Sequence, residues 1–125
     1  MSLNNMSLNN PVRATFRHLL PSDELMTHIR REAEHLCAQH PAVRDVAATI
    51  ELPNRSRRSG RVFRARVQLA VSGAALIAKS QAGDPHDALR RAFRAAERNV
   101  NHTLGRRREA RSRGGRTHSD EMTDA

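Results

Sequence analysis

Hydrophobic residues recur along the chain with two different periods, which distinguish four strand-like segments from two helical ones. Alternation of apolar and polar residues, the period of a strand with one buried face, marks residues 12–17, 43–52, 61–71 and 75–80. Residues 23–39 and 85–108 instead repeat apolar residues every three or four positions, as amphipathic helices do. The predicted order of elements is therefore β-α-β-β-β-α.

This order predicts an α+β fold with a four-stranded mixed sheet. A helical crossover between the first two strands favours a parallel, right-handed pair, and the shorter links after it favour an antiparallel meander. Both helices would then be packed on one sheet face. The other face would be left to solvent, in agreement with the outward positions of Arg13, Arg17, Arg64 and Arg66.

The folded domain is assigned to residues 12–108. Residues 1–11 begin with the pentapeptide M-S-L-N-N given twice, and residues 109–125 lack apolar periodicity. Both segments are polar and are expected to be disordered, because they contain too little apolar surface to form a core.

The last predicted helix has two contrasting sides. Asp84 is a good N-cap, and Pro85 suits the first helical position. The apolar stripe consists of Leu89, Ala92, Phe93, Ala96, Val100 and Leu104. The opposite side carries Arg90, Arg91, Arg94 and Arg98, continued by Arg106, Arg107 and Arg108 if the helix passes Gly105.

Few carboxylates accompany these arginines. Asp87, four residues before Arg91, and Glu97 are the nearest ones. One-sided charge of this kind favours binding to a polyanion over the alternative, a helix face that is merely solvated.

The net charge of the whole chain, +9, is unevenly distributed. Residues 12–52 carry 5 Arg and 6 acids, whereas residues 53–116 carry 16 Arg and one Lys against 4 acids. This asymmetry is typical of a nucleic-acid-binding surface. The chain has no Trp or Tyr, and its three Phe occupy apolar positions, so recognition of the RNA backbone and shape is expected rather than base stacking.

Three stretches of sequence together resemble a known family. They are F-R-H-L-L-P-S-D-E-L-M-T-H-I from residue 16, R-V-F-R-A-R-V-Q-L from residue 61, and A-G-D-P-H-D-A-L-R-R-A-F-R-A-A-E-R-N-V-N-H-T-L-G-R-R-R-E from residue 82. In these residues the chain resembles the ribosome hibernation promoting factor and ribosome-associated inhibitor family. The resemblance covers about residues 12–108 and implies a double-stranded-RNA-binding-domain-like fold.

The resemblance also implies a function and a partner. Members bind the small ribosomal subunit and its rRNA near the decoding centre, exclude tRNA and messenger RNA, and keep ribosomes inactive under stress. Carried over by position, the RNA-contacting residues would be Arg30, Arg31, Arg90, Arg91, Arg94 and Arg98. The chain lacks the extra C-terminal domain of the long form, so the resemblance places it with the short, non-enzymatic members.

Other chemistry is weakly supported by the sequence. His28, Glu32 and His35 share a helix face, but no further ligands with zinc-site spacing are evident, so no metal or other cofactor is expected. No nucleophile elbow, P-loop or pair of catalytic carboxylates appears. Nor is there an apolar run that could span a membrane, or a signal-peptide pattern, and a cytoplasmic protein, monomeric when free, is expected.

Two questions stay open at this stage. The loop with Arg55, Arg57 and Arg58 fits an RNA-contacting finger or a solvated turn equally well. The domain as a whole could also be a general double-stranded nucleic-acid binder, or a regulatory module that pairs with a protein through its sheet.

Overall fold

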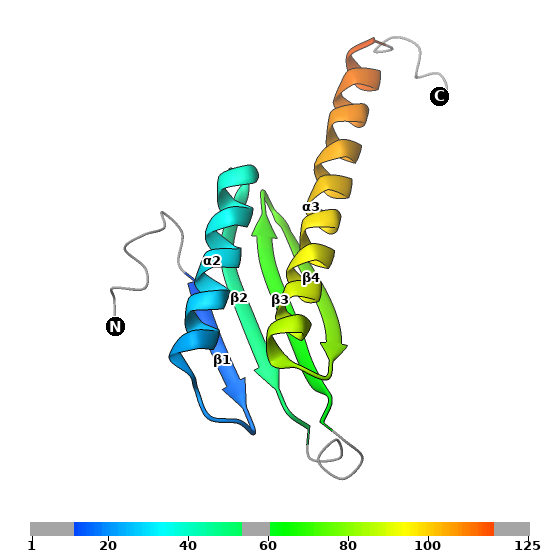
Figure 1. Ribbon diagram of the computed structural model, residues 1–125. Helices are drawn as coiled ribbons and strands as arrows, with labels where there is room; N and C mark the ends of the chain where they lie inside the picture. Colours follow the sequence, from blue (N-terminus) through cyan, green and yellow to red (C-terminus); the bar gives the residue numbers. More distant parts are fainter. Residues whose placement is uncertain (1–11, 54–60, 117–125) are drawn as a thin grey trace.

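Two helices lie on one face of a four-stranded sheet in the computed structural model of the protein (Figure 1). The structure describes residues 12–53 and 61–116, with side chains as far as residue 106. The elements in chain order are β1 (Val12–Arg17), α2 (Asp23–Gln39), β2 (Val43–Glu51), β3 (Phe63–Val71), β4 (Ala74–Ala82) and α3 (Pro85–Arg116). Disorder was expected for residues 1–11 and 109–125; residues 1–11 and 117–125 lie outside those described, whereas residues 109–116 are helical, so the expectation was wrong for them.

The sheet has the strand order β1-β2-β3-β4. β1 pairs in parallel with β2, and α2 forms the crossover between them. β2, β3 and β4 pair in an antiparallel manner. The predicted α+β fold, with a four-stranded mixed sheet in the order β-α-β-β-β-α, is therefore confirmed.

The core lies between the sheet and the helices. Every second residue of β3 is buried, from Phe63 to Val71, and the residues between them face away from the core. α2 contributes Leu25, Ile29, Ala33 and Leu36, and α3 contributes Ala88, Leu89, Ala92, Phe93, Ala96 and Val100. Burial of each large apolar side chain contributes roughly 1.5–3 kcal/mol, so the apolar stripes of both helices hold them against this face.

The β3–β4 hairpin closes through Ser72 and Gly73. Both residues have positive φ angles, 39° and 87° respectively. Two-residue turns with positive φ match the right-handed twist of the flanking strands. The hairpin thus fixes the register in which Val71 pairs with Ala74 and, further along, Arg66 pairs with Lys79.

Four elements have boundaries that differ from those predicted. β2 ends at Glu51 rather than at residue 52, and β3 begins at Phe63 rather than at residue 61. β4 runs from Ala74 to Ala82 because its ends pair with β3 along the whole hairpin. α3 continues beyond residue 108, where the domain was predicted to end, to Arg116. Gly105 does not stop the helix, and many of the following residues are Arg, Glu or Ala, which favour helical backbone.

Candidate nucleic-acid interface

The start of α3 is fixed by its own side chains. The Asp84 carboxylate accepts a hydrogen bond from the backbone N–H of Asp87 at 3.1 Å, and Pro85 occupies the first helical position. This arrangement satisfies a backbone donor that a helix N-terminus otherwise leaves unpaired. The N-cap therefore sets where each later residue of α3 points.

The predicted arginines of α3 lie on its solvent side. Arg91, Arg94, Arg98 and Arg106 are exposed, and Arg90 is partly buried. At about 100° per residue, these positions fall opposite the buried residues Leu89, Ala96 and Val100. Arg90, Arg91, Arg94 and Arg98 thus form one stripe, which we call the α3 Arg stripe.

Two of the four arginines have partners within the domain. Arg90 pairs with Asp87, three residues earlier, although Asp87 also has the i, i+4 spacing to Arg91. Arg91 instead donates through Nη1 to the backbone carbonyl of Gln81 at 3.2 Å, because it lies beside the end of β4. Among the residues described, neither Arg94 nor Arg98 has an ion pair or hydrogen bond.

The remaining acid near the stripe is directed elsewhere. Glu97 lies 3.3 Å from Nε2 of His40, at the end of α2, and so faces the neighbouring helix. The α3 Arg stripe consequently keeps most of its positive charge available to an external anion.

α2 differs from α3 in the charge of its surface. Its only basic residues besides histidine are Arg30 and Arg31, and its acids are Asp23, Glu24, Glu32 and Glu34. Arg31 is exposed, whereas Arg30, about 100° further around the helix, is half-buried. The two arginines therefore differ in accessibility, and with four acids against two arginines the surface of α2 has no excess of positive charge.

The two helices meet through a pair of histidines. The rings of His28 and His86 are stacked at 4.9 Å between centroids, with their Nδ1 atoms 2.7 Å apart. Nε2 of His28 also lies 3.1 Å from a Glu32 carboxylate oxygen. Within the described part of the chain, no three His, Cys, Asp or Glu side chains are placed to hold a metal ion.

The remaining candidate arginines belong to the link between β2 and β3 and to the last turns of α3. Arg55, Arg57 and Arg58 lie outside the described residues, so both interpretations of that loop stay open. Arg107 and Arg108 belong to the continuous backbone of α3. Of the described helices, none combines the length and the apolar character needed to cross a membrane.

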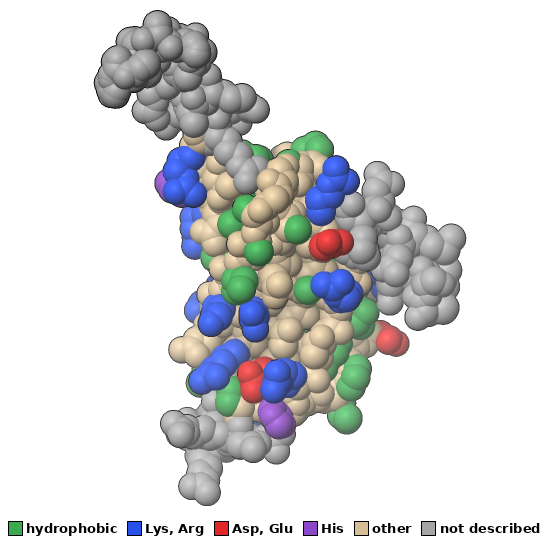
Figure 2. Space-filling view, turned by 180° about the vertical axis from the view of Figure 1, so that it is seen from behind, with side chains coloured by type: hydrophobic (Ala, Val, Ile, Leu, Met, Phe, Trp, Pro, Cys, Tyr) green, Lys and Arg blue, Asp and Glu red, His purple; other side chains and the backbone are tan. Residues whose placement is uncertain are grey.

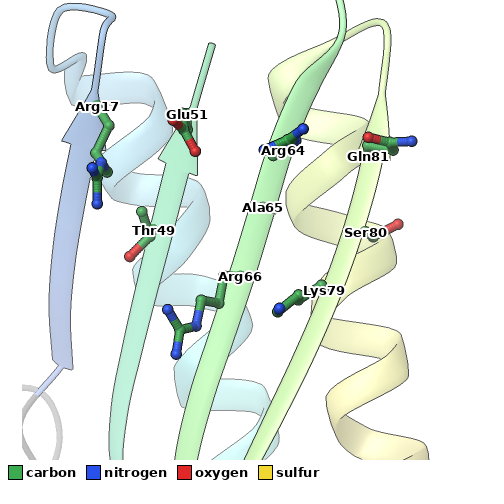
Figure 3. Close-up of a pocket in the computed structure, with 9 residues that line it drawn as sticks. All are labelled: Arg17, Thr49, Glu51, Arg64, Ala65, Arg66, Lys79, Ser80 and Gln81. Atoms are coloured by element: carbon green, nitrogen blue, oxygen red, sulfur yellow. The ribbon is translucent and has the colours of Figure 1, made fainter. Parts of the chain in front are cut away.

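The uncovered face of the sheet is a second basic surface. Figure 2 shows Lys and Arg side chains distributed over this face, with few acidic ones. A depression of about 580 Å³ on it is lined by Arg17, Thr49, Glu51, Arg64, Ala65, Arg66, Lys79, Ser80 and Gln81 (Figure 3). Sequence reasoning placed three of these arginines on the solvent face but did not identify a site, because their grouping depends on strand register.

Comparison with known proteins identifies the family. The model of the "Sigma 54 modulation protein / S30EA ribosomal protein" family matches residues 12–108. The chain therefore belongs to this family of ribosome-associated proteins, and the resemblance stated from the sequence is confirmed. No curated protein gave a significant match.

Solved structures share the fold at low sequence identity. The N-terminal domain of Protein Y from Thermus thermophilus is 17% identical, with a TM-score of 0.63, and the match covers 75% of this chain and 98% of that one. A ribosomal subunit interface protein from Coxiella burnetii is 9% identical, with a TM-score of 0.58, over 75% of this chain and 97% of that one. At these identities the likeness shows the fold alone.

Proposed function

We propose that the protein binds rRNA of the small ribosomal subunit through the α3 Arg stripe and thereby inhibits translation. The observation that supports this most directly is the pair Arg94 and Arg98, which are exposed and have no partner among the described residues. Membership in a ribosome-associated family suggests the ribosome as the partner. The positive charge of the stripe would attract the phosphate groups of its RNA.

The stripe suits the phosphate backbone of folded RNA. Each guanidinium can donate two parallel hydrogen bonds to phosphate oxygens. α3 is about 48 Å long at 1.5 Å per residue, and it projects beyond the sheet (Figure 1). Phe63 and Phe93 are buried and Phe16 is half-buried, so the described residues offer no exposed Phe, Tyr or Trp ring for base stacking.

Inhibition would follow from occupancy rather than from chemistry on a substrate. A domain seated on the RNA of the small subunit competes with tRNA and messenger RNA for the same surface. We therefore propose a non-enzymatic cytoplasmic factor, monomeric when free, that promotes ribosome hibernation under stress.

Equilibrium binding to purified small subunits tests this proposal. Replacement of Arg94 and Arg98 by Gln removes two exposed charges and leaves the core unchanged. The slope of log K against log [salt] should then become shallower by roughly 1.4–1.8, because each phosphate neutralised by a side chain adds about 0.7–0.9 to it. Circular dichroism should report an unchanged fold.

A matched variant controls for net charge. Arg44 and Arg61 are exposed and lie away from the stripe, so their joint replacement by Gln should change the slope much less. Equal effects of the two variants would reject a specific role for the stripe. Equal affinity for free RNA duplex and for small subunits would instead favour a general nucleic-acid binder.

A further inference from the structure

The uncovered sheet face brings together cations from three strands. Cross-strand pairing places Arg17, Glu51, Arg64 and Gln81 in one row and Thr15, Thr49, Arg66 and Lys79 in the next. All of the cations in these rows are exposed. Arg17, Arg64, Arg66 and Lys79 line the depression described above, and we call them the sheet cation cluster.

The cluster is not neutralised within the domain. Arg66 and Lys79 are direct cross-strand partners in the antiparallel β3–β4 pair. Like charges in this position repel each other, since their Cβ atoms are only about 5 Å apart. Glu51 is the one carboxylate in the lining, and no ion pair within the described ranges involves it.

The form of the cluster indicates an extended anion. From β1 to β4 it spans three interstrand steps, or about 14 Å. That width exceeds a single phosphate group and suits a polymer that lies across the strands. Figure 3 shows Thr49 between the side chain of Arg17, above it in the view, and the side chains of Arg66 and Lys79, below it.

The neutral residues of the face agree with a nucleic-acid backbone. Thr49 and Gln81 line the depression from this face and can hydrogen-bond to phosphate or ribose oxygens. Ile77, at 43%, is the one exposed large apolar side chain on the described strands, and Val62 just before β3 is exposed to 37%, so the face offers little apolar area to a protein partner.

We propose that the sheet cation cluster is a second binding surface for the phosphate backbone of RNA. It lies on the side of the domain opposite the helices, so the domain would hold one RNA segment on α3 and another on the sheet. This inference extends the proposed function, on which it rests for the RNA partner. It predicts that one protein molecule bridges two RNA segments.

A bridging assay with the full chain tests the inference. Donor-labelled and acceptor-labelled poly(U) oligomers are mixed with limiting protein, and energy transfer between them is measured. The sheet variant Arg66→Gln/Lys79→Gln and the helix variant Arg94→Gln/Arg98→Gln should each abolish transfer yet still bind single oligomers. Each should also lower the salt slope by about 1.4, because two single-strand phosphate contacts are removed.

Two further variants provide controls. The variant Arg44→Gln/Arg61→Gln removes the same amount of charge near the ends of the strands. These positions are roughly four or five residues from the level of Arg66 along the strands, so this variant should retain bridging. Lys79→Arg keeps the charge and should retain bridging as well. Thermal melts of all variants check that the reduced transfer is not due to unfolding.

The inference is overturned if the sheet variant shows wild-type energy transfer and salt slope. It is also overturned if binding to poly(U) is unchanged while binding to poly-glutamate falls, since the face would then take an acidic protein. Binding to small subunits serves as a separate readout. If the wild-type protein bridges poly(U) oligomers but does not bind small subunits, the proposed function is rejected and the second RNA-binding surface is retained.

Discussion

The four guanidinium groups of the α3 Arg stripe differ in how strongly the domain itself engages them. Arg90 is paired with Asp87, and Arg91 donates to the carbonyl of Gln81. Arg94 and Arg98 are exposed and have no such contacts with described residues. A phosphate has to compete with Asp87 for Arg90, but it meets no competing carboxylate at Arg94 or Arg98.

This difference gives a prediction for single substitutions. Arg98→Gln should lower the salt slope of RNA binding by about 0.7–0.9, the value for one phosphate contact. Arg90→Gln should lower it less, because Asp87 already partly neutralises the charge that this substitution removes. Fluorescence titrations across a salt series would measure both, and a larger effect at Arg90 would contradict this ranking.

Residue identity predicted these positions but not their partners. The i, i+3 and i, i+4 spacings from Asp87 are both compatible with pairing. Asp87 pairs with Arg90 rather than with Arg91 because Arg91 contacts the end of β4. No local sequence pattern predicts that contact. The contact between His28 and His86 is likewise invisible in sequence, because it joins residues of two different helices.

Among the elements, α3 is longer than its sequence pattern indicated. Gly105 lies within it, and an added Cβ there would meet no atom within 4 Å. Gly105→Ala should therefore stabilise the domain by up to about 1 kcal/mol and increase helical circular dichroism, since Gly is the weaker helix former.

The turn glycine provides the opposite control. Gly73 has a φ of 87°, a conformation in which a Cβ is strained. Gly73→Ala should destabilise the β3–β4 hairpin by roughly 1–2 kcal/mol. Chemical denaturation of the two variants measures both effects, and effects of the same sign would contradict this account of the two glycines.

The sheet allows a prediction in which stability and binding change in opposite directions. Lys79→Glu would place a carboxylate opposite Arg66 and replace repulsion with attraction. At this exposed position the gain should be only a few tenths of a kcal/mol. RNA binding should weaken at the same time.

Thermal melts and poly(U) titrations test this pair of effects, with Lys79→Gln as the neutral control. A variant that is stabilised and yet binds RNA as well as the wild type would show that the sheet cation cluster makes no contact with RNA. The test thus separates a binding role for Lys79 from a purely structural one.

At the level of elements, alternation and helical periodicity were sufficient to predict all six. Val46, Ala48 and Ile50 face the core as their alternation indicates. The extension of β4 to Ala82 was missed, because Gln81 and Ala82 are held by pairing with Arg64 and Phe63 rather than by an apolar pattern of their own. The sheet cation cluster was missed for the same reason, since only register places Arg66 opposite Lys79.

In the whole molecule, positive charge is concentrated on the two outer surfaces of the fold. The α3 Arg stripe lies on the outer side of the helical layer and the sheet cation cluster on the open side of the sheet, with the core between them. α2 lacks an excess of positive charge. This distribution suits the proposed contact with RNA on two sides of the domain.

The most direct test of ribosome binding through α3 is sedimentation of a stationary-phase lysate through sucrose gradients at low and high salt. The wild-type protein should migrate with small subunits or whole ribosomes at low salt and dissociate at high salt. The variant with Arg90, Arg91, Arg94 and Arg98 all changed to Glu should remain at the top of the gradient while retaining its fold. Ribosome association of that variant, or a wild-type protein that stays at the top at every salt concentration, would contradict the account.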